Sequence, residues 1–271
     1  MAERVGVIGA GRMGLPIIGH LVRAGFEVFV SDRDQSKRQA VEQRGAHFVE
    51  GALEVVQNAS TILIAVGYDR EVRELLLEPT ELSQRASSGT IFAVLSTVSP
   101  YTVQFLAESS QKYGVHVVDS PVCRGGRAAD QGTLLSFVAG DDEEIERLRS
   151  VLKAYSSDVV PTGPVGTAQV AKAVNNMILW ATLVADHEGL ALAQRFGVNI
   201  QALRSALLMS SATNGALENW GNQTMAWAED DMAIIGEMAS QIGIALPQAG
   251  VTREICRALK PRRYRLKEYG K

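Results

Sequence analysis

The sequence predicts an α/β fold, in which a doubly wound parallel sheet is followed by an all-α domain. Short, continuously apolar runs alternate with helical stretches through the first part of the chain, as is typical of parallel strands buried on both faces. After about residue 164 only helical patterns follow. The stretch from residue 163 on to Arg195 opens with a Gly/Pro turn and is then rich in Ala and Leu, which predicts one helix. A helix of about 30 residues would be about 45 Å long, so we expect it to join the two domains.

The composition narrows the classes of partner. The 271 residues, 46% hydrophobic and 21% charged, suit one large globular domain or two of ordinary size. A net charge of −3 argues against nucleic acid or an anionic membrane as a partner, and no apolar run is long enough to cross a membrane. Cys123 and Cys256 make no disulfide framework, and the first strand begins too early for a signal peptide. We expect a cytoplasmic protein with a small-molecule substrate.

A strand, a glycine motif and a helix follow one another at the N-terminus. Residues 4–8 are apolar, residues 9–14 read Gly-Ala-Gly-Arg-Met-Gly, and residues 15–24 are amphipathic. This order is the signature of the dinucleotide-binding unit of a Rossmann fold. The sequence therefore predicts a cofactor site at the start of the chain.

Each glycine of this motif has a physical role. Gly9 permits the tight turn, Gly11 lets the backbone approach a pyrophosphate, and Gly14 lets helix and strand pack closely. The free N–H groups at the start of the helix then face the anion. Arg12 and Met13 lie in the same loop and are expected to contact the cofactor.

A second strand is predicted at residues 26–33. Asp32 and Arg33 at its end point to different cofactors. An acidic side chain at this position accepts hydrogen bonds from the adenosine ribose and repels a 2′-phosphate. A guanidinium can stack on adenine or bind that phosphate. We expect NAD to be preferred, with NADP as the alternative. Asp32 has a second interpretation, as the N-cap of the next helix.

The strand pattern repeats along the first domain. Further strands are predicted at residues 46–49, 61–66, 90–95, 115–119 and 156–160. Ligands of such sheets lie beyond the C-terminal ends of the strands, which places Gly67, Ser96 and Thr97 near the cofactor. Three histidines fall within predicted helices or strands and are interpreted as structural or surface residues: His20, His47 and His116. No metal site is predicted.

Two further stretches carry polar groups with a possible chemical role. Residues 119–134 follow the sixth strand and contain Gly125 and Gly126, which can form a concavity of N–H groups for an anionic oxygen or an ordinary turn. Near the start of the long helix, Lys172, Asn175 and Asn176 share one face. Taken alone, that face is equally well a solvated edge.

Beyond the boundary near residue 164 the chain is predicted to be helical. The two domains are expected to be residues 1–163 and 164–271, with helices at residues 200–208, 216–227, 231–242 and 248–259. Pro247 suits the start of the last helix. The basic segment from Lys260 to Lys267 is interpreted as a solvated tail, with a subunit contact as the alternative.

These motifs together resemble the β-hydroxyacid dehydrogenase family, which includes 3-hydroxyisobutyrate dehydrogenases and tartronate semialdehyde reductases. The matching stretches occur in order over nearly the whole chain: residues 9–14, 96–100, 119–134 and 163–176. The resemblance implies an all-helical substrate and oligomerisation domain after the Rossmann domain, and a homodimer or homotetramer. It implies NAD(P)-dependent hydride transfer between a small 3-hydroxy acid and its semialdehyde.

The resemblance also implies roles for individual residues. In that family the double-glycine loop binds the substrate carboxylate, so Gly125 and Gly126 are expected to do so here. The helix lysine of the family, Lys172 here, is the general acid/base, and the following Asn176 holds the substrate, with Asn175 beside it. A lysine accepts a proton only as the neutral amine, so oxidation is expected to be favoured at alkaline pH.

The chain departs from the family pattern at two places. The family loop usually reads Pro-Val-Ser-Gly-Gly, whereas residues 121–126 read Pro-Val-Cys-Arg-Gly-Gly, which places Cys123 and Arg124 at the expected substrate. A later family lysine aligns with Asp230, also assigned to substrate binding. Either Arg124 takes over carboxylate recognition or it pairs with Asp230. Asp230 also favours an alternative, a reductase of a non-acidic carbonyl or imine. A non-catalytic NAD-binding scaffold is the remaining alternative.

Overall fold

The computed structural model describes residues 2–222 and 225–259 of the chain. The chain divides into two compact units, Met1–Lys172 and Ala173–Lys271. The division falls within the long helix α9 (Thr167–Arg195), which forms over the residues expected of it. The basic segment that begins at Lys260 lies outside the described residues.

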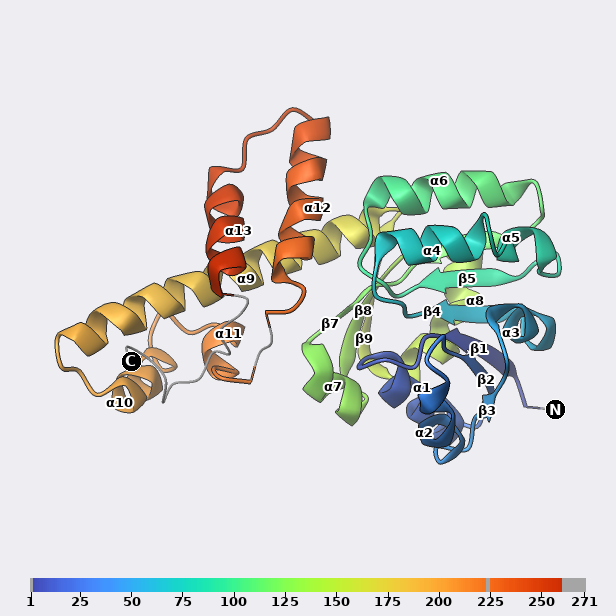
Figure 1. Ribbon diagram of the computed structural model, residues 1–271, viewed down its shortest axis with the longest axis horizontal. Helices are drawn as coiled ribbons and strands as arrows, with labels where there is room; N and C mark the ends of the chain where they lie inside the picture. The colour runs from blue at the N-terminus through green and yellow to red at the C-terminus, as the bar shows by residue number, and fades with distance from the viewer. Residues whose placement is uncertain (1, 223–224, 260–271) are drawn as a thin grey trace. The chain divides into compact units, whose positions relative to one another are not determined.

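The first unit is built on one nine-stranded sheet (Figure 1). Its strands are β1 (Arg4–Ile8), β2 (Glu27–Ser31), β3 (His47–Phe48), β4 (Thr61–Ile64), β5 (Ile91–Val94), β6 (His116–Asp119), β7 (Val122–Cys123), β8 (Leu134–Ala139) and β9 (Ser156–Gly163). The strand order is β3-β2-β1-β4-β5-β6-β8-β7, and β9 pairs with β8. The strands from β3 to β6 are parallel, with β1 between β2 and β4.

The predicted fold class is confirmed, with one correction to the sheet. It is mostly parallel, because β8 pairs antiparallel with both β6 and β7. Neither β7 nor β8 was predicted from the sequence. Residues 134–139 read Leu-Leu-Ser-Phe-Val-Ala, an apolar run that is itself a strand signal.

Helices pack on both faces of this sheet, and alternate strand residues belong to different cores. Leu63 packs with side chains of α1 (Gly14–Arg23) and α8 (Asp142–Lys153). Its neighbours Ile62 and Ile64 pack on the other face. The helices of that second face are α3 (Ala52–Asn58), α4 (Asp69–Leu76), α5 (Leu82–Arg85) and α6 (Pro100–Gln111). Two short helices, η1 (Gln35–Lys37) and α2 (Arg38–Glu42), follow β2.

The histidines of this unit make structural contacts. The His20 ring nitrogen Nε2 lies 2.9 Å from the carbonyl oxygen of Ala129. His47 stacks on Phe29. His116 Nδ1 lies 2.7 Å from a carboxylate oxygen of Glu144, which is buried. These contacts agree with the structural interpretation of the three residues.

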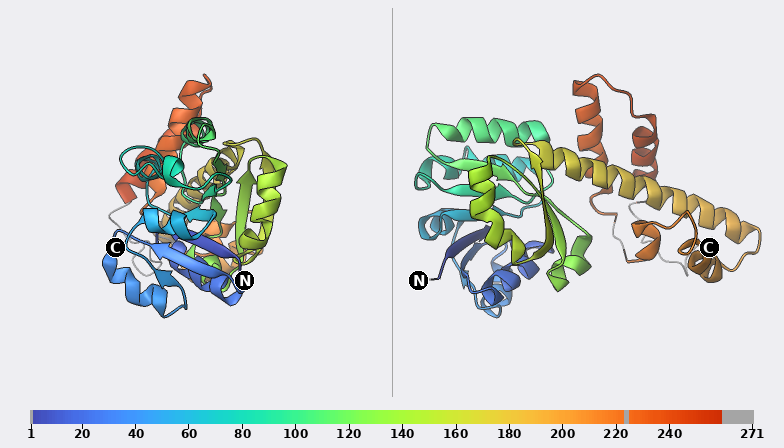
Figure 2. Two further views of the ribbon diagram at one scale, coloured as in Figure 1. Left: turned by 90° about the vertical axis from the view of Figure 1, so that its right-hand side faces the viewer. Right: turned by 180° about the vertical axis from the view of Figure 1, so that it is seen from behind.

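The described part of the second unit is helical. Its helices are the later part of α9, α10 (Ile200–Leu207), α11 (Gly215–Glu218), α12 (Ala228–Gln241) and α13 (Pro247–Leu259). Figures 1 and 2 show α12 and α13 side by side, and their buried side chains share a core with Trp180 and Leu183 of α9. The helix predicted over residues 216–227 is wrong, because α11 ends at Glu218. Gly221, at φ +84°, has a backbone conformation that an α-helix cannot contain.

Candidate active site

The glycine loop has the geometry that a dinucleotide site requires. Gly9 has φ +104°, and a Cβ added there would collide with the carbonyl oxygen of Ala65. A Cβ at Gly14 would collide with the carbonyl oxygen of Gly9, so strand and helix meet this closely only without side chains. No described atom outside the loop's immediate neighbours lies within 4 Å of a Cβ added at Gly11. The backbone there is open to a phosphate group, so the loop fits a dinucleotide.

Asp32 connects this loop to the end of β2. Its carboxylate accepts hydrogen bonds from the backbone N–H of Ala10 at 2.7 Å and of Asp34 at 2.8 Å. The N-cap of the following helix η1 is Asp34, whose side chain accepts from the N–H of Ser36. The N-cap interpretation of Asp32 is therefore wrong. Carboxylate oxygens have two lone pairs each, so Asp32 retains acceptor capacity for ribose hydroxyls.

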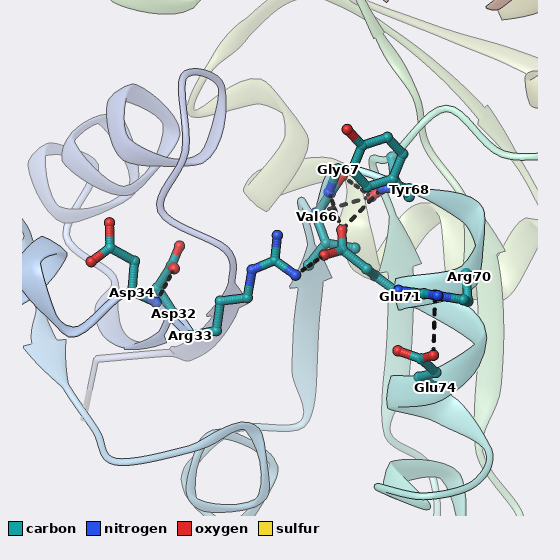
Figure 3. A network of polar contacts seen from close by, with 10 residues as sticks. Asp32, Arg33, Asp34, Val66, Gly67, Tyr68, Arg70, Glu71 and Glu74 are labelled. Carbon is teal, nitrogen blue, oxygen red and sulfur yellow. Dashed lines mark hydrogen bonds and ion pairs between the residues drawn. The ribbon is translucent and has the colours of Figure 1, made fainter. Parts of the chain in front are cut away.

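Arg33 forms an ion pair with Glu71 of α4 (Figure 3). The other carboxylate oxygen of Glu71 accepts hydrogen bonds from the backbone N–H groups of Gly67 at 2.8 Å and Tyr68 at 3.0 Å. Glu71 was not singled out from the sequence. The N–H of Gly67, expected near the cofactor, is therefore engaged by Glu71.

Ser96 and Thr97 follow β5. The Ser96 hydroxyl accepts from the N–H of Val66 at 3.0 Å and donates to the carbonyl oxygen of Val66 at 2.9 Å. Ser96 is buried, whereas Thr97 is half-buried. Ser96 thus fastens the end of β5 to the end of β4, beside the strand that leads into the glycine loop.

The stretch after β6 is not an extended loop. Cys123 is buried in β7, and Gly125 opens a short helix, α7 (Gly125–Gln131). Arg124 and Gly125 have φ values of +81° and +71°, the left-handed conformation in which glycine carries no steric cost. The first N–H groups of a helix have no acceptor within it. The two glycines therefore present N–H groups, as the concavity interpretation requires, but from a helix end.

Arg12 connects the glycine loop to α7. Its guanidinium donates two hydrogen bonds to the Asp130 carboxylate, at 2.8 and 2.7 Å. The hydrogen bond from Arg12 is the main cause that lowers the pKa of Asp130. A Cβ at Gly126 would lie 2.6 Å from the guanidinium carbon of Arg12. A side chain at position 126 would therefore displace the guanidinium of Arg12 from its present position.

Arg124 is bound at the start of β9. Its Nη1 donates to Asp158 at 2.7 Å, to the Ser157 hydroxyl at 2.8 Å and to the Thr133 carbonyl oxygen at 3.1 Å. The pKa of Asp158 is lowered first by its hydrogen bond with Ser157 and then by Arg124. Within the first unit, the carboxylate paired with Arg124 is therefore Asp158.

The start of α9 is held by the buried carboxylate of Asp119, at the end of β6. Its two oxygens accept from the backbone N–H groups of Gly166 at 2.8 Å and Gln169 at 2.9 Å. Burial raises the pKa of Asp119, and these hydrogen bonds oppose that shift. Neither Asp119 nor Gln169 was assigned a role from the sequence. A carboxylate at the end of an apolar strand was the available signal.

The Gln169 side chain makes a second attachment of α9 to the sheet. Its amide nitrogen donates to the Ser96 carbonyl oxygen at 2.9 Å, and its amide oxygen accepts from the Val98 N–H at 3.1 Å. One turn further along the helix, Lys172 Nζ donates to the carbonyl oxygen of Val122 at 2.8 Å. The ammonium is half-buried beside β7. Three attachments therefore fix Lys172 against the sheet.

The remaining predicted site residues belong to the second unit. The Asn175 side-chain amide donates to the Asn176 side-chain oxygen at 3.0 Å. Asn176 is buried and Asn175 half-buried. Asp230 is exposed in the first turn of α12. Helical spacing places Asn176 one turn after Lys172 on α9.

The described residues hold neither a metal site nor a membrane span. No group of three His, Cys, Asp or Glu side chains there is arranged to hold a metal ion. None of the helices described combines the length and apolar character needed to span a membrane.

Comparison with known proteins gives a family match for each part of the chain. Residues 4–163 match the family described as the NAD binding domain of 6-phosphogluconate dehydrogenase. Residues 166–267 match the family described as the NAD-binding of NADP-dependent 3-hydroxyisobutyrate dehydrogenase. An NAD-dependent L-serine dehydrogenase from Pseudomonas aeruginosa is 30% identical over 216 residues, which cover 80% of this chain and 72% of the relative.

Solved structures resemble the chain along nearly its whole length. A 3-hydroxyisobutyrate dehydrogenase from Mycobacterium tuberculosis, with L-serine, has a TM-score of 0.87 at 22% identity and covers 97% of this chain and 96% of its own. An imine reductase variant from Myxococcus stipitatus, in complex with NAD+, has a TM-score of 0.69 at 19% identity, with coverages of 97% and 96%. At these identities the likeness establishes the fold.

Replacing Asp119 by Ala is predicted to lower the free energy of unfolding by about 2–4 kcal/mol, because two buried N–H groups of α9 lose their acceptors. Urea unfolding of the full chain measures this. Asp141→Ala is the matched control, since Asp141 is the exposed N-cap residue of α8 and makes no side-chain cap bond. Its expected change is within about 0.5 kcal/mol. Equal losses of the free energy of unfolding in the two variants would contradict the role of Asp119 in holding the start of α9.

The Asp119→Asn variant tests the charge of this group. Burial raises the pKa of Asp119 above its ordinary value, so the folded state binds the proton more tightly than the unfolded state. The stability this provides is fully present below the unfolded-state pKa and is lost as pH rises through the folded-state pKa. The difference in free energy of unfolding, wild type minus Asp119→Asn, should therefore shrink as pH rises from about 4 to about 7. A difference that grows with pH would mean that the α9 N–H groups outweigh burial.

Proposed function

The chain belongs to the β-hydroxyacid dehydrogenase family, and from that premise we propose that it interconverts a small 3-hydroxy acid and its semialdehyde, with Lys172 as the general acid/base. The observation that carries the proposal is the hydrogen bond of Lys172 Nζ to the Val122 carbonyl oxygen at 2.8 Å. It holds a proton donor next to residues 123–126, the stretch assigned to the substrate.

Family membership confirms the resemblance drawn from the motifs. The chain is an oxidoreductase that acts on hydroxyl groups with NAD or NADP as its cofactor. A non-catalytic NAD-binding scaffold, the least favoured alternative, is not compatible with that assignment. The nicotinamide supplies the hydride chemistry when bound, and the residues around it bind, orient and move protons.

Lys172 is proposed to move the proton of the substrate hydroxyl. In the oxidising direction the neutral amine accepts that proton, and in the reducing direction the ammonium returns one to the developing alkoxide. An ammonium has three donors, so the hydrogen bond to Val122 does not by itself exhaust them. Asn176, with Asn175 beside it, is proposed to orient the substrate oxygen.

The substrate acid group is proposed to be bound by backbone N–H groups. Gly125 and Gly126 stand in the first turn of α7, where N–H groups lack helical acceptors. Arg124 is a weaker candidate for this role, because its guanidinium already donates to Asp158 and Ser157. A side-chain thiol at Cys123, buried in β7, replaces the family hydroxyl on this side.

NAD is proposed as the preferred cofactor. Asp32 offers acceptors to the ribose hydroxyls and repels a 2′-phosphate. Arg33, the residue that favours NADP, is in an ion pair with Glu71. The positive charge of Arg33, which would bind a 2′-phosphate, is therefore already neutralised by Glu71.

A reductase of a non-acidic carbonyl or imine is the second candidate. Two observations favour it: Asp230 is an exposed acid aligned with a lysine of the family, and Asp158 neutralises Arg124. An acid in place of a lysine repels carboxylates and attracts cationic groups. The fold shared with an imine reductase is compatible with either activity.

A homodimer or homotetramer in the cytoplasm is proposed for the assembled protein. Within the second unit, large apolar side chains are exposed, including Phe196 at 80% and Met209 at 84%. Such side chains are common at subunit contacts. Neither Cys123 nor Cys256 forms a disulfide, which suits a reducing compartment. Light scattering coupled to size exclusion measures the oligomeric state.

Lys172→Ala is predicted to lower turnover by about 10²–10⁴-fold, the usual effect of losing a general acid/base. Binding of NAD, measured by calorimetry, should stay almost unchanged because the glycine loop is intact. Lys153→Ala is the control, since Lys153 is an exposed lysine in the last turn of α8 and should leave turnover unaffected. Unchanged turnover in Lys172→Ala would contradict the assignment.

Oxidation of a 3-hydroxy acid is predicted to accelerate as pH rises, because only the neutral amine of a lysine accepts a proton. The measurement is the formation of reduced nicotinamide with a panel of 3-hydroxy acids, neutral alcohols and amino alcohols. A rate that is flat from neutral to alkaline pH would argue against a lysine base. Turnover of neutral or cationic compounds, with none of any acid, would favour the second candidate.

A further inference from the structure

Arg33 and Glu71 form an ion pair whose two members differ in how firmly they are held (Figure 3). The Glu71 side chain is 13% exposed and the Arg33 side chain is 81% exposed. Glu71 is also fixed by two hydrogen bonds from the backbone N–H groups of Gly67 and Tyr68. The Glu71 carboxylate is therefore held in place without Arg33, and it is the Arg33 guanidinium whose position is set by Glu71.

The pair lies at the edge of the sheet where a dinucleotide binds. Arg33 follows β2, and Glu71 lies in α4, the helix after β4. These two strands flank β1 in the sheet, and β1 leads directly into the glycine loop. An ion pair between the segments after β2 and β4 therefore spans the C-terminal end of β1. In a Rossmann fold this is the side that receives the adenosine half of the cofactor.

The pair changes what Arg33 can offer to that half. A guanidinium binds a phosphate through its fork of N–H donors and binds an aromatic ring through its flat face. Glu71 pairs with Nη1 at the edge of the guanidinium, and the exposure of Arg33 leaves the flat face accessible. A 2′-phosphate would also meet the negative charges of Asp32 and Glu71. A free 2′-hydroxyl meets no such repulsion.

We propose that Glu71 determines the cofactor preference of this protein. By pairing with Arg33 it withholds the guanidinium from a 2′-phosphate and keeps it for stacking on adenine, so that NAD is preferred over NADP. The inference rests on the NAD preference proposed above and assigns it to a residue outside the glycine motif. Glu71 acts through Arg33 and is a positioning residue with respect to the cofactor.

The test is Glu71→Gln, with dissociation constants for NAD and NADP measured by calorimetry on the full chain. Glutamine can still accept from the N–H groups that start α4, but it carries no charge to hold Arg33. NADP is expected to bind about ten- to hundredfold more tightly than to the wild type, the effect of one hydrogen bond to a charged group. NAD affinity should change by less than about threefold.

Glu74→Gln is the matched control. Glu74 lies on the same helix, and its carboxylate pairs with Arg70 at 3.2 Å and not with Arg33 (Figure 3). The Glu74→Gln variant removes the same negative charge from the same helix as Glu71→Gln. If only the overall charge mattered, the two variants would gain equally in NADP affinity. Our proposal predicts a gain in Glu71→Gln only. Equal gains would overturn it.

Arg33→Ala provides the second arm. Added to Glu71→Gln, it should abolish the gain in NADP affinity, because the released guanidinium is the group that binds the phosphate. Alone, it should weaken NAD and leave NADP nearly unchanged. The proposal fails if the wild type binds NADP more tightly than NAD, or if Glu71→Gln leaves NADP binding weak. These binding measurements need no substrate, so failure to oxidise 3-hydroxy acids is a separate outcome.

Discussion

The hydrogen bonds between the Asp119 carboxylate and the first turn of α9 are the constraint on which the proposed site depends. Burying a carboxylate costs free energy unless it is hydrogen-bonded, and here two backbone N–H groups and the positive end of a 29-residue helix face it. Gln169 then binds the backbone after β5 with both ends of its amide. Lys172 follows by less than one turn. Its position is thus set by the sheet and not by a loop.

Three arginines were expected near the cofactor or the substrate, and each of them is already paired with a carboxylate. Arg12 is bound to Asp130, Arg33 to Glu71 and Arg124 to Asp158. The Arg12 and Arg124 pairs are exposed on both sides and contribute about 0–1 kcal/mol each, so they are weak enough to exchange with a ligand anion. The Arg33 pair differs, because Glu71 is 13% exposed and is also held by two backbone N–H groups. Because these arginines are engaged, the backbone N–H groups of the glycine loop and of the first turn of α7 are the better preorganised anion ligands.

Sequence reasoning located the features that depend on local patterns. The strands from β1 to β6, the glycine motif and the long helix were all predicted, because continuous apolar runs and helix-forming composition are local signals. The strands β7 and β8 depend on pairings made across the fold. So do the partners of Arg33 and Arg124, which lie 38 and 34 positions away along the chain. Gly125 and Gly126 were interpreted as a concavity of N–H groups, with an ordinary turn as the alternative, and they lie in the first turn of α7.

The acceptor that holds Lys172 is suited to the proton transfer proposed for this residue. A carbonyl oxygen, here that of Val122, accepts a hydrogen bond from an ammonium and from a neutral amine alike. A carboxylate in its place would favour the charged form through its own charge. The nitrogen can therefore keep its position in both halves of a reversible proton transfer. The polar neighbours on the helix, Asn175 and Asn176, are also uncharged. Neither adds a charge that would favour the ammonium or the neutral amine of Lys172.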